Sequence, residues 1–213
     1  GNAGPIIYNT SPGIISSTAP ASNGNCGSSY SYQWQQSTDG GNNYSDISSA
    51  TGLTYTPGNL TTTTYYKRKV TCGSETGYSN ILIVTVGSPL TGGTISGGGS
   101  TITNGTSPGT LSNVTGAGGG ICGTSYSYQW QQSTDGGNNY SDIASATNTS
   151  YAVGNLTTNT SFRRQVNCSG EIQYSNVISI TVAPELLPGS IDGNTGPIIA
   201  NTSPGTMTSV SPA

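Results

Sequence analysis

The sequence contains no histidine, and only 6% of its residues are charged. Without histidine, the chain lacks the base of Ser-His-Asp and Cys-His catalytic centres and the commonest zinc ligand. A net charge of −3 spread over 213 residues leaves no basic patch for phosphates, which argues against a nucleic-acid partner. No stretch approaches the roughly 20 apolar residues of a membrane-spanning helix. We therefore expect no enzymatic activity, no cofactor, no nucleic-acid partner and no membrane span in this segment.

The eight acidic residues form no pattern typical of a catalytic centre. Two aspartates lie near each other in each repeat, around a Gly-Gly turn: Asp39 and Asp46 in the first, and Asp135 and Asp142 in the second. As a glycosidase pair they would need a cleft, which a small sandwich rarely supplies. Together with nearby asparagines they are weak candidates for calcium, which takes six to eight oxygen ligands. Turn chemistry explains the same residue types without a metal, and we favour it.

An eighteen-residue stretch, YSYQWQQSTDGGNNYSDI, occurs twice without a change, at residues 30–47 and 126–143. The same offset of 96 residues relates Trp34 to Trp130 and one pair of cysteines to the other. A fixed offset of this length indicates tandem domains. We predict a first repeat at residues 1–87, with a truncated first strand, and a second repeat at residues 88–183.

The two ends of the chain also match each other, because residues 1–21 recur with few changes as residues 193–213. Residues 184–213 therefore have two interpretations. They are either the opening strands of a third repeat or a donor strand that completes the sheet of a neighbouring copy.

Within a repeat, short alternating apolar runs are separated by Gly, Pro, Asn and Asp, a pattern typical of strands. In the second repeat it predicts a split first strand at residues 93–96 and 101–103. Further strands are predicted at residues 110–115, 126–133, 140–143, around 151, at 162–168 and at 175–182. The Gly-rich run 116–120 is expected to be a loop. The side chains expected to point inward are Leu111, Val114, Ile178, Ile180 and Val182, with Leu82, Val84 and Val86 in the first repeat. No segment has a convincing helical period, so the chain is predicted to be all-β.

A corner motif refines this fold class. Leu156 is followed six residues later by Phe162, as Leu60 is by Tyr66, and the aromatic residue begins a strand. This spacing fits the corner that joins the two sheets of an immunoglobulin-type sandwich. We therefore predict tandem immunoglobulin-like β-sandwich domains, joined by short Pro-containing linkers into a semi-rigid rod.

Four cysteines lie at matching positions, two in each repeat. An even, matched set favours one disulfide per repeat, Cys26–Cys72 and Cys122–Cys168, in an oxidising compartment. Two free buried thiols per repeat are the alternative. The tryptophan strand should lie antiparallel to the strand after the corner, so each disulfide would join adjacent strands at one pole. This differs from the inter-sheet bridge of antibody domains.

Two kinds of side chain have both a structural and a ligand-binding interpretation. Arg68 and Arg164 share a strand face with the core residues Tyr66 and Phe162. We expect each guanidinium to stack on Trp34 or Trp130 inside its domain, and the alternative is a ligand-binding arginine. The glutamines Gln33, Gln35, Gln129 and Gln131 are expected to be exposed. They would contact carbohydrate with the nearby tyrosines, or else form an ordinary solvated face.

Asn-x-Ser/Thr motifs are unusually frequent. If the host glycosylates at this motif, a glycan coat would shield a surface poor in charge. Chance matches in a Ser/Thr-rich chain are the alternative. The candidate sites are Asn9, Asn43, Asn59, Asn104, Asn139, Asn155 and Asn201.

The stretches YSYQWQQSTDGGNNYSDI, ATGLTYTPGNLTTTTYYKRKVTC and YSNILIVTV together resemble a known family. These are the immunoglobulin-like repeats of very large surface and secreted proteins of Bacteroidetes, including gliding-motility adhesins. The resemblance implies an exported, repetitive molecule that serves as a stalk or adhesive fibre at the cell surface. It supplies no catalytic residues.

We expect a structural role in cell adhesion, with neighbouring repeats or further copies of the chain as partners in an extracellular filament. The alternative is a module that binds surface glycans or proteins multivalently.

Overall fold

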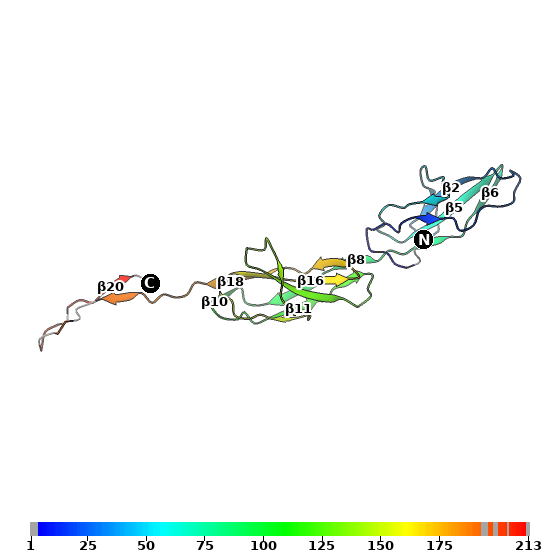
Figure 1. The fold of residues 1–213 in the computed structure, drawn as a ribbon. Helices are drawn as coiled ribbons and strands as arrows, with labels where there is room; N and C mark the ends of the chain where they lie inside the picture. The colour runs from blue at the N-terminus through cyan, green and yellow to red at the C-terminus, as the bar shows by residue number, and fades with distance from the viewer. Residues whose placement is uncertain (1–3, 193–195, 198–199, 204, 212–213) are drawn as a thin grey trace.

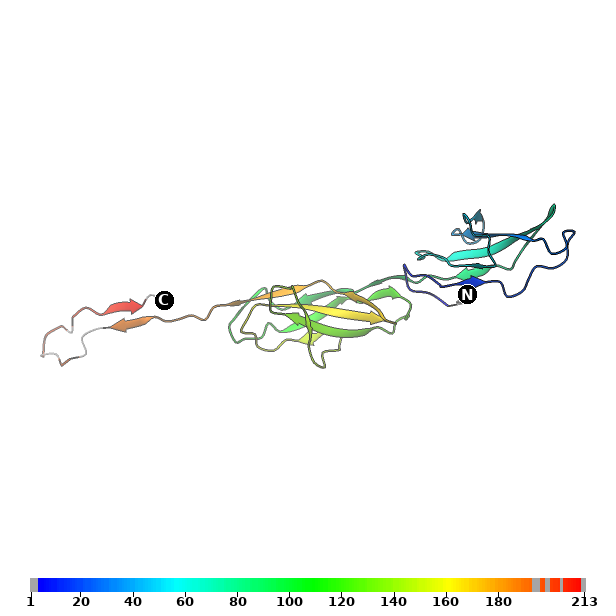
Figure 2. The ribbon, with the colours of Figure 1, turned by 45° about the horizontal axis from the view of Figure 1, so that its top comes forward.

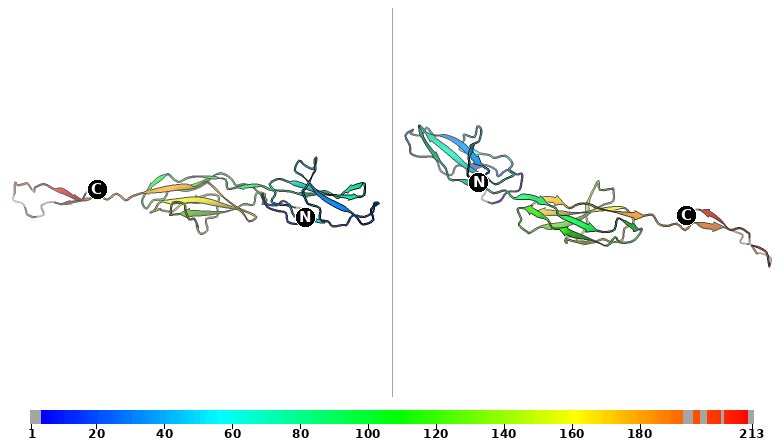
Figure 3. Two further views of the ribbon diagram at one scale, coloured as in Figure 1. Left: turned by 90° about the horizontal axis from the view of Figure 1, so that it is seen from above. Right: turned by 180° about the vertical axis from the view of Figure 1, so that it is seen from behind.

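The computed structural model describes residues 4–192, 196–197, 200–203 and 205–211. All regular elements in these residues are β-strands. Two groups of strands lie end to end, and a final strand pair extends beyond them (Figure 1). Figures 2 and 3 show the same linear arrangement from other sides. The all-β prediction is confirmed. Within the described part of the chain, no helix is long and apolar enough to cross a membrane.

The first group of strands is built around one long antiparallel pair, β2 and β5, matched from Ser31↔Thr71 to Ser37↔Tyr65. β3 pairs with β2, whereas β6 and β7 pair with opposite ends of β5, and β1 pairs with β4 separately. The strands are β1 (Ile15–Ser16), β2 (Ser31–Ser37), β3 (Ser45–Asp46), β4 (Thr54–Tyr55), β5 (Thr64–Cys72), β6 (Glu75–Tyr78) and β7 (Leu82–Val84).

The second group repeats these strands and adds others. Its strands are β8 (Ser88–Thr91), β9 (Thr94–Gly97), β10 (Thr101–Thr103), β11 (Thr110–Thr115), β12 (Gly118–Gly120), β13 (Ser127–Ser133), β14 (Ser141–Asp142), β15 (Tyr151–Ala152), β16 (Thr160–Cys168), β17 (Glu171–Tyr174) and β18 (Ile178–Ala183). One sheet has the order β10-β18-β16-β13-β14, with β17 also on β16, and a second sheet has the order β15-β11-β9.

This strand order is that of an immunoglobulin-like sandwich. The opening strand is split between the sheets, because β9 pairs antiparallel with β11 while β10 pairs parallel with β18. Apolar side chains from both sheets meet between them, with Leu111, Trp130 and Phe162 fully buried. The predicted fold class is therefore confirmed, including the split first strand.

Three local predictions were wrong. Residues 118–120 are not loop but form β12, which pairs with β8. Strand β17, which lies before the predicted last strand, was not predicted. Most of its residues are exposed, so its sequence has no alternation of apolar residues. Val114 is 60% exposed. It follows Leu111 by three residues, which places it on the opposite face of the strand, beside an irregularity in the pairing with β9.

The last strand pair is β19 (Ser190–Asp192) and β20 (Thr208–Ser211). Its register, Ser190↔Ser211 and Ile191↔Ser209, is that of β9 and β11 moved by one repeat, including the irregularity between the first two pairs. The opening hairpin of a repeat therefore recurs in these residues. Positions 193–195, 198–199, 204 and 212–213 of the predicted terminal segment lie outside the described residues.

Candidate functional site

Each repeat carries one disulfide, and the predicted pairing is confirmed. Cys26 bonds to Cys72 and Cys122 to Cys168, with Cα–Cα distances of 5.2 Å and 5.3 Å. Cys168 ends β16 and Cys122 lies shortly before β13, the antiparallel neighbour of β16. Each bond therefore joins neighbouring strands at one pole of the sandwich rather than the two sheets, as the sequence predicts.

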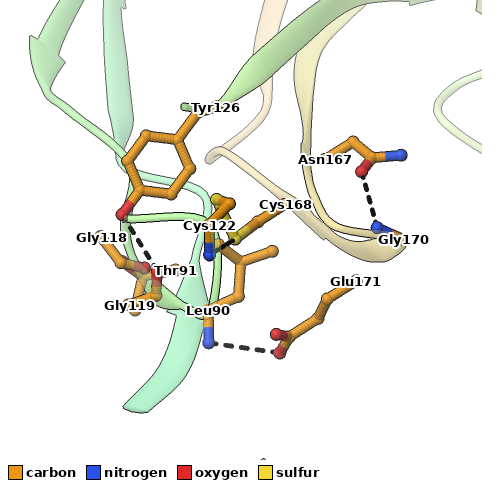
Figure 4. Close-up of a disulfide and its surroundings, with 10 residues drawn as sticks. All are labelled: Leu90, Thr91, Gly118, Gly119, Cys122, Tyr126, Asn167, Cys168, Gly170 and Glu171. Atoms are coloured by element: carbon orange, nitrogen blue, oxygen red, sulfur yellow. Dashed lines mark hydrogen bonds between the residues drawn. A yellow bond between two sulfur atoms is a disulfide. The ribbon is translucent and has the colours of Figure 1, made fainter. Parts of the chain in front are cut away.

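In the second repeat this pole is closed by the segment that enters from the first repeat (Figure 4). The Leu90 N–H donates to a Glu171 carboxylate oxygen at 3.3 Å, and β8 pairs with β12. Gly120 lies against the disulfide so closely that a Cβ there would be 2.4 Å from the Cys168 sulfur. The glycine-rich run is therefore a close-packed strand at the pole. Its glycines are needed for this close packing and not for a loop, which is why composition alone gave the wrong prediction.

The two arginines are buried inside their domains. Arg68 is 4% exposed and Arg164 is not exposed. The Arg164 guanidinium carbon lies 4.6 Å from the ring centroid of Tyr128 and 6.0 Å from that of Trp130, and Nη1 donates to the Thr149 carbonyl at 2.7 Å. Burial lowers the pKa of Arg164. The nearest ring is thus a tyrosine rather than the expected tryptophan, and these contacts favour a structural role over ligand binding.

The tryptophans form the centres of the two cores. Trp34 and Trp130 donate through Nε1 to the carbonyls of Gly52 and Asn148, at 3.0 Å and 2.9 Å. Beside Trp34, the Tyr66 hydroxyl is buried without a hydrogen-bond partner in the described part of the chain, and burial raises its pKa to about 12. Its counterpart is Phe162, which fills the same position without a polar atom.

The repeated aspartates organise turns. The Asp135 carboxylate accepts hydrogen bonds from the Asn139 N–H at 3.0 Å, the Ser133 hydroxyl at 2.6 Å and the Asn139 side chain at 2.7 Å. Asp142 instead accepts from Gln131 at 2.7 Å. Asp39 and Asp46 make the same contacts in the first repeat. In the described residues no group of three or more His, Cys, Asp or Glu is placed to hold a metal. The hydrogen bonds therefore support the turn-forming role of these aspartates.

The turns at Asp39 and Asp135 should make the stability of the repeats depend on pH. Hydrogen bonds, first from the Asn139 N–H and then from the Ser133 hydroxyl, hold the pKa of Asp135 well below its usual value of 3.8, and Asp39 behaves likewise. Because the pKa of the Asp135 carboxyl group is lower in the folded chain than in the unfolded chain, its ionised form stabilises the fold. This stabilisation is complete above pH 3.8 and is lost as the pH falls through the pKa of the folded state. We expect the urea midpoint to fall below about pH 4. In an Asp39→Asn/Asp135→Asn variant the urea midpoint should fall less over the same pH range. An equally steep fall would contradict the stabilising role of the two aspartates.

The four glutamines are not the open face that the sequence suggested. Gln131 is 8% exposed, and Gln129 is half-buried. The Gln129 amide donates to the carbonyls of Trp130 and Ile143 at 2.9 Å and 2.7 Å, and Gln33 makes the matching pair of bonds. Gln35 and Gln131 donate to Asp46 and Asp142. These amides hold the two strands of each hairpin together, which corrects the expectation that the glutamines are exposed. Carbohydrate binding stays a prediction.

The asparagine motifs fall into two environments. Asn43 and Asn139 use their side-chain nitrogens in the aspartate turns, with donor–acceptor distances of 2.7 Å, and a glycan there would compete with that bond. Asn104 is half-buried. The exposed candidates are Asn9, Asn59, Asn155 and Asn201. Glycosylation stays a prediction, with these exposed positions as the best candidates.

One further feature was missed from the sequence: a groove on the first repeat, made of two adjoining cavities of about 410 Å³ and 280 Å³. Ala19, Arg68 and Ser79 line both cavities, so the two are continuous. We call this feature the strand groove. The remaining apolar lining includes Tyr30, Val70 and Cys72 in the larger cavity and Trp34, Tyr66 and Leu82 in the smaller one.

The strand order and disulfides define a class of immunoglobulin-like β-sandwich repeats. The chain belongs to the family described as a domain of unknown function (DUF8696), whose model matches residues 2–88 and again residues 91–184. A search of curated proteins finds no match.

Two solved structures of immunoglobulin-like proteins are similar to the chain. Murine CEACAM1b is 13% identical, with a TM-score of 0.36, and the match covers 84% of this chain and 95% of that one. The titin domains A168–A170 are 12% identical, with a TM-score of 0.37, and the match covers 86% of this chain and 61% of that one. The fold assignment rests on the strand order, and no function is taken from either protein.

Proposed function

We propose that the chain is a structural segment of a long extracellular adhesin or surface filament, in which disulfide-stapled repeats form a semi-rigid rod. Each repeat would be one domain, divided near residues 87 and 183. The resemblance to repeats of large Bacteroidetes surface proteins supports this placement. Two disulfides support an oxidising, extracellular location.

The observation that carries the proposal is the packed junction between the repeats. Only residues 85–87 separate β7 from β8. Val86 forms a parallel bridge with Ile6, and the Gly87 N–H donates to the Ile6 carbonyl at 2.9 Å. On the other side, a Cβ at Gly87 would lie 2.5 Å from the Ile121 side chain. The junction is thus held by both repeats, which limits bending and keeps them end to end.

Small-angle scattering tests the rod. We expect a rod-like profile at low protein concentration, because the junction has no free hinge. Inserting four Gly/Ser residues between Gly87 and Ser88 should lower the mean radius of gyration, because a flexible linker lets the repeats fold back. The same insertion after Gly58, in an exposed loop of the first repeat, is the control and should leave the profile unchanged. If the junction insertion also changes nothing, the semi-rigid rod is wrong.

A further inference from the structure

The basic side chains of the chain gather on two matching strands. All five lie on β5 or β16, the long central strand of each repeat. Arg68 and Arg164 are buried in the cores, whereas Lys67, Lys69 and Arg163 occupy the alternate, half-buried positions on the outer face of the sheet. In a chain with so few charges, this outer face is where an anionic ligand would be attracted.

Arg163 is held between two tyrosine rings. Its guanidinium carbon lies 3.9 Å from the ring centroid of Tyr140 and 3.9 Å from that of Tyr174. Its Nε donates to the Gln131 side-chain oxygen at 2.7 Å. We call Tyr140, Arg163 and Tyr174 the tyrosine–arginine stack. The stack fixes the plane of the guanidinium before any ligand arrives, so little side-chain freedom would be lost on binding.

The stack leaves the forked edge of the guanidinium available. In the described part of the chain, Arg163 makes no ion pair, and its Nη1 and Nη2 have no hydrogen-bond partner. The carboxylate on the same face, Asp142, accepts a hydrogen bond from Gln131 instead. A planar guanidinium with two free NH₂ groups matches the two oxygens of a carboxylate. The tyrosines cover its two flat sides, so a ligand would approach along this edge.

A polar cavity of about 230 Å³ adjoins the stack, and Tyr140 belongs to both. Ser133, Thr134, Asn139 and Ser141 also line the cavity. Hydroxyl and amide groups therefore dominate its lining. Such a lining suits a ligand rich in hydroxyl groups, because a hydroxyl both donates and accepts hydrogen bonds.

The turn aspartate sets the orientation of such a ligand. Asp135 also lines the cavity, and its carboxylate is held there by the hydrogen bonds of the turn. Because like charges repel, a carboxylate of the ligand would lie at Arg163 and its uncharged hydroxyls in the cavity. The site therefore favours a sugar ring with a single carboxylate over a ligand with densely spaced negative charges.

We propose that the second repeat binds acidic polysaccharides, with the carboxylate of a uronic-acid residue on Arg163 and the ring hydroxyls in the adjoining cavity. This binding function goes beyond the structural role proposed above and does not depend on it. A rod with such a site would attach to an anionic surface polymer through the side of its second repeat.

The first repeat has a different cation at the equivalent position. Lys67 stands where the second repeat has Arg163, and its Nζ lies 3.9 Å from the ring centroid of Tyr44 and 4.5 Å from that of Tyr78. The two tyrosines are thus retained, but an ammonium group lacks the planar fork that pairs with both carboxylate oxygens. We expect weaker binding by the first repeat.

The first repeat also has a larger side chain beside the turn. In the second repeat, Ser161 pairs directly with Ser133, which lines the cavity. The first repeat has Tyr65 at the position of Ser161, and a Cβ at Gly41 in its turn would lie 3.3 Å from that ring. A tyrosine at position 161 should therefore fill the cavity, and the first repeat shows that the fold accepts it.

The test is calorimetric titration of the full 213-residue chain with trigalacturonate at physiological ionic strength. We expect saturable binding with one site per chain, and no binding of the methyl-esterified trisaccharide. Arg163→Gln should weaken binding by at least about tenfold, because the charge-assisted hydrogen bonds are lost. Lys69→Gln is the matched control. It removes the same charge outside the stack and introduces the residue found at position 165, so binding should be unchanged.

Two further variants test the cavity and the fork. Ser161→Tyr leaves the stack intact and should also weaken binding by at least about tenfold, since the sugar ring loses its place. A Tyr65→Ser/Lys67→Arg variant should give the first repeat the same site and raise the stoichiometry from one to two. A stoichiometry that stays at one would overturn the assignment to these positions.

The remaining outcomes concern the class of ligand. Equal weakening by Arg163→Gln and Lys69→Gln, or equal binding of the methyl ester, would overturn the carboxylate site. Tri-L-glutamate that binds as tightly as trigalacturonate would assign the site to acidic proteins and overturn the saccharide proposal. The scattering test of the rod is independent of all these results.

Discussion

Replacing Cys122 and Cys168 by alanine is expected to lower the free energy of unfolding of the second repeat by about 4 kcal/mol. The bond closes a loop of 46 residues, and its loss frees the unfolded chain to sample many more conformations. Cys168 is also fully buried against Leu90, so its removal weakens the packing of β8 at the pole. For a small domain this loss is comparable to much of its total stability.

The measurement is urea unfolding monitored by hydrogen exchange, with protection read separately for peptides of each repeat. Loss of protection should be confined largely to residues 88–183 in the variant. The matched Cys26→Ala/Cys72→Ala variant should instead affect the first repeat. Equal destabilisation of both repeats by either variant would show that the domains do not unfold as independent units.

Trp130→Ala is expected to destabilise the second repeat by roughly 3–5 kcal/mol. Trp130 is fully buried, its ring centroid lies 5.8 Å from that of Tyr151, and its indole nitrogen donates to Asn148. Truncation removes the largest fully buried side chain of the core and leaves a cavity that the rigid sheets cannot close.

Trp34→Ala provides the comparison within one chain. Trp34 is 5% exposed and borders the strand groove, so its removal enlarges an existing opening rather than creating a closed cavity. We expect a smaller loss of stability than for Trp130→Ala in the same urea titration. A larger loss at position 34 would mean that the groove is closed in solution.

The sequence by itself determined the repeat, the fold class and the cysteine pairing. Identical residues at a fixed offset specify two copies of one fold, and alternating apolar residues locate strands because side chains alternate between the faces of a sheet. The corner at Leu156 and Phe162 and the turn at Asp135 were also recognisable, since both depend on residues close together in the chain. Strands in which buried residues alternate with less buried ones, such as β16, were therefore well placed.

Tertiary structure decided what depends on distant neighbours. Strands β12 and β17 exist because β8 and β16 lie beside them, and their own composition contains little sign of it. Arg164 stacks on Tyr128, and Gln131 is bound by Asp142, because pairing brings those groups together. The strand groove depends on residues distant in sequence, such as Ala19 and Arg68, which only folding brings together. Burial is a property of the assembled sheets, so equivalent residues such as Leu90 and Leu186 have opposite environments.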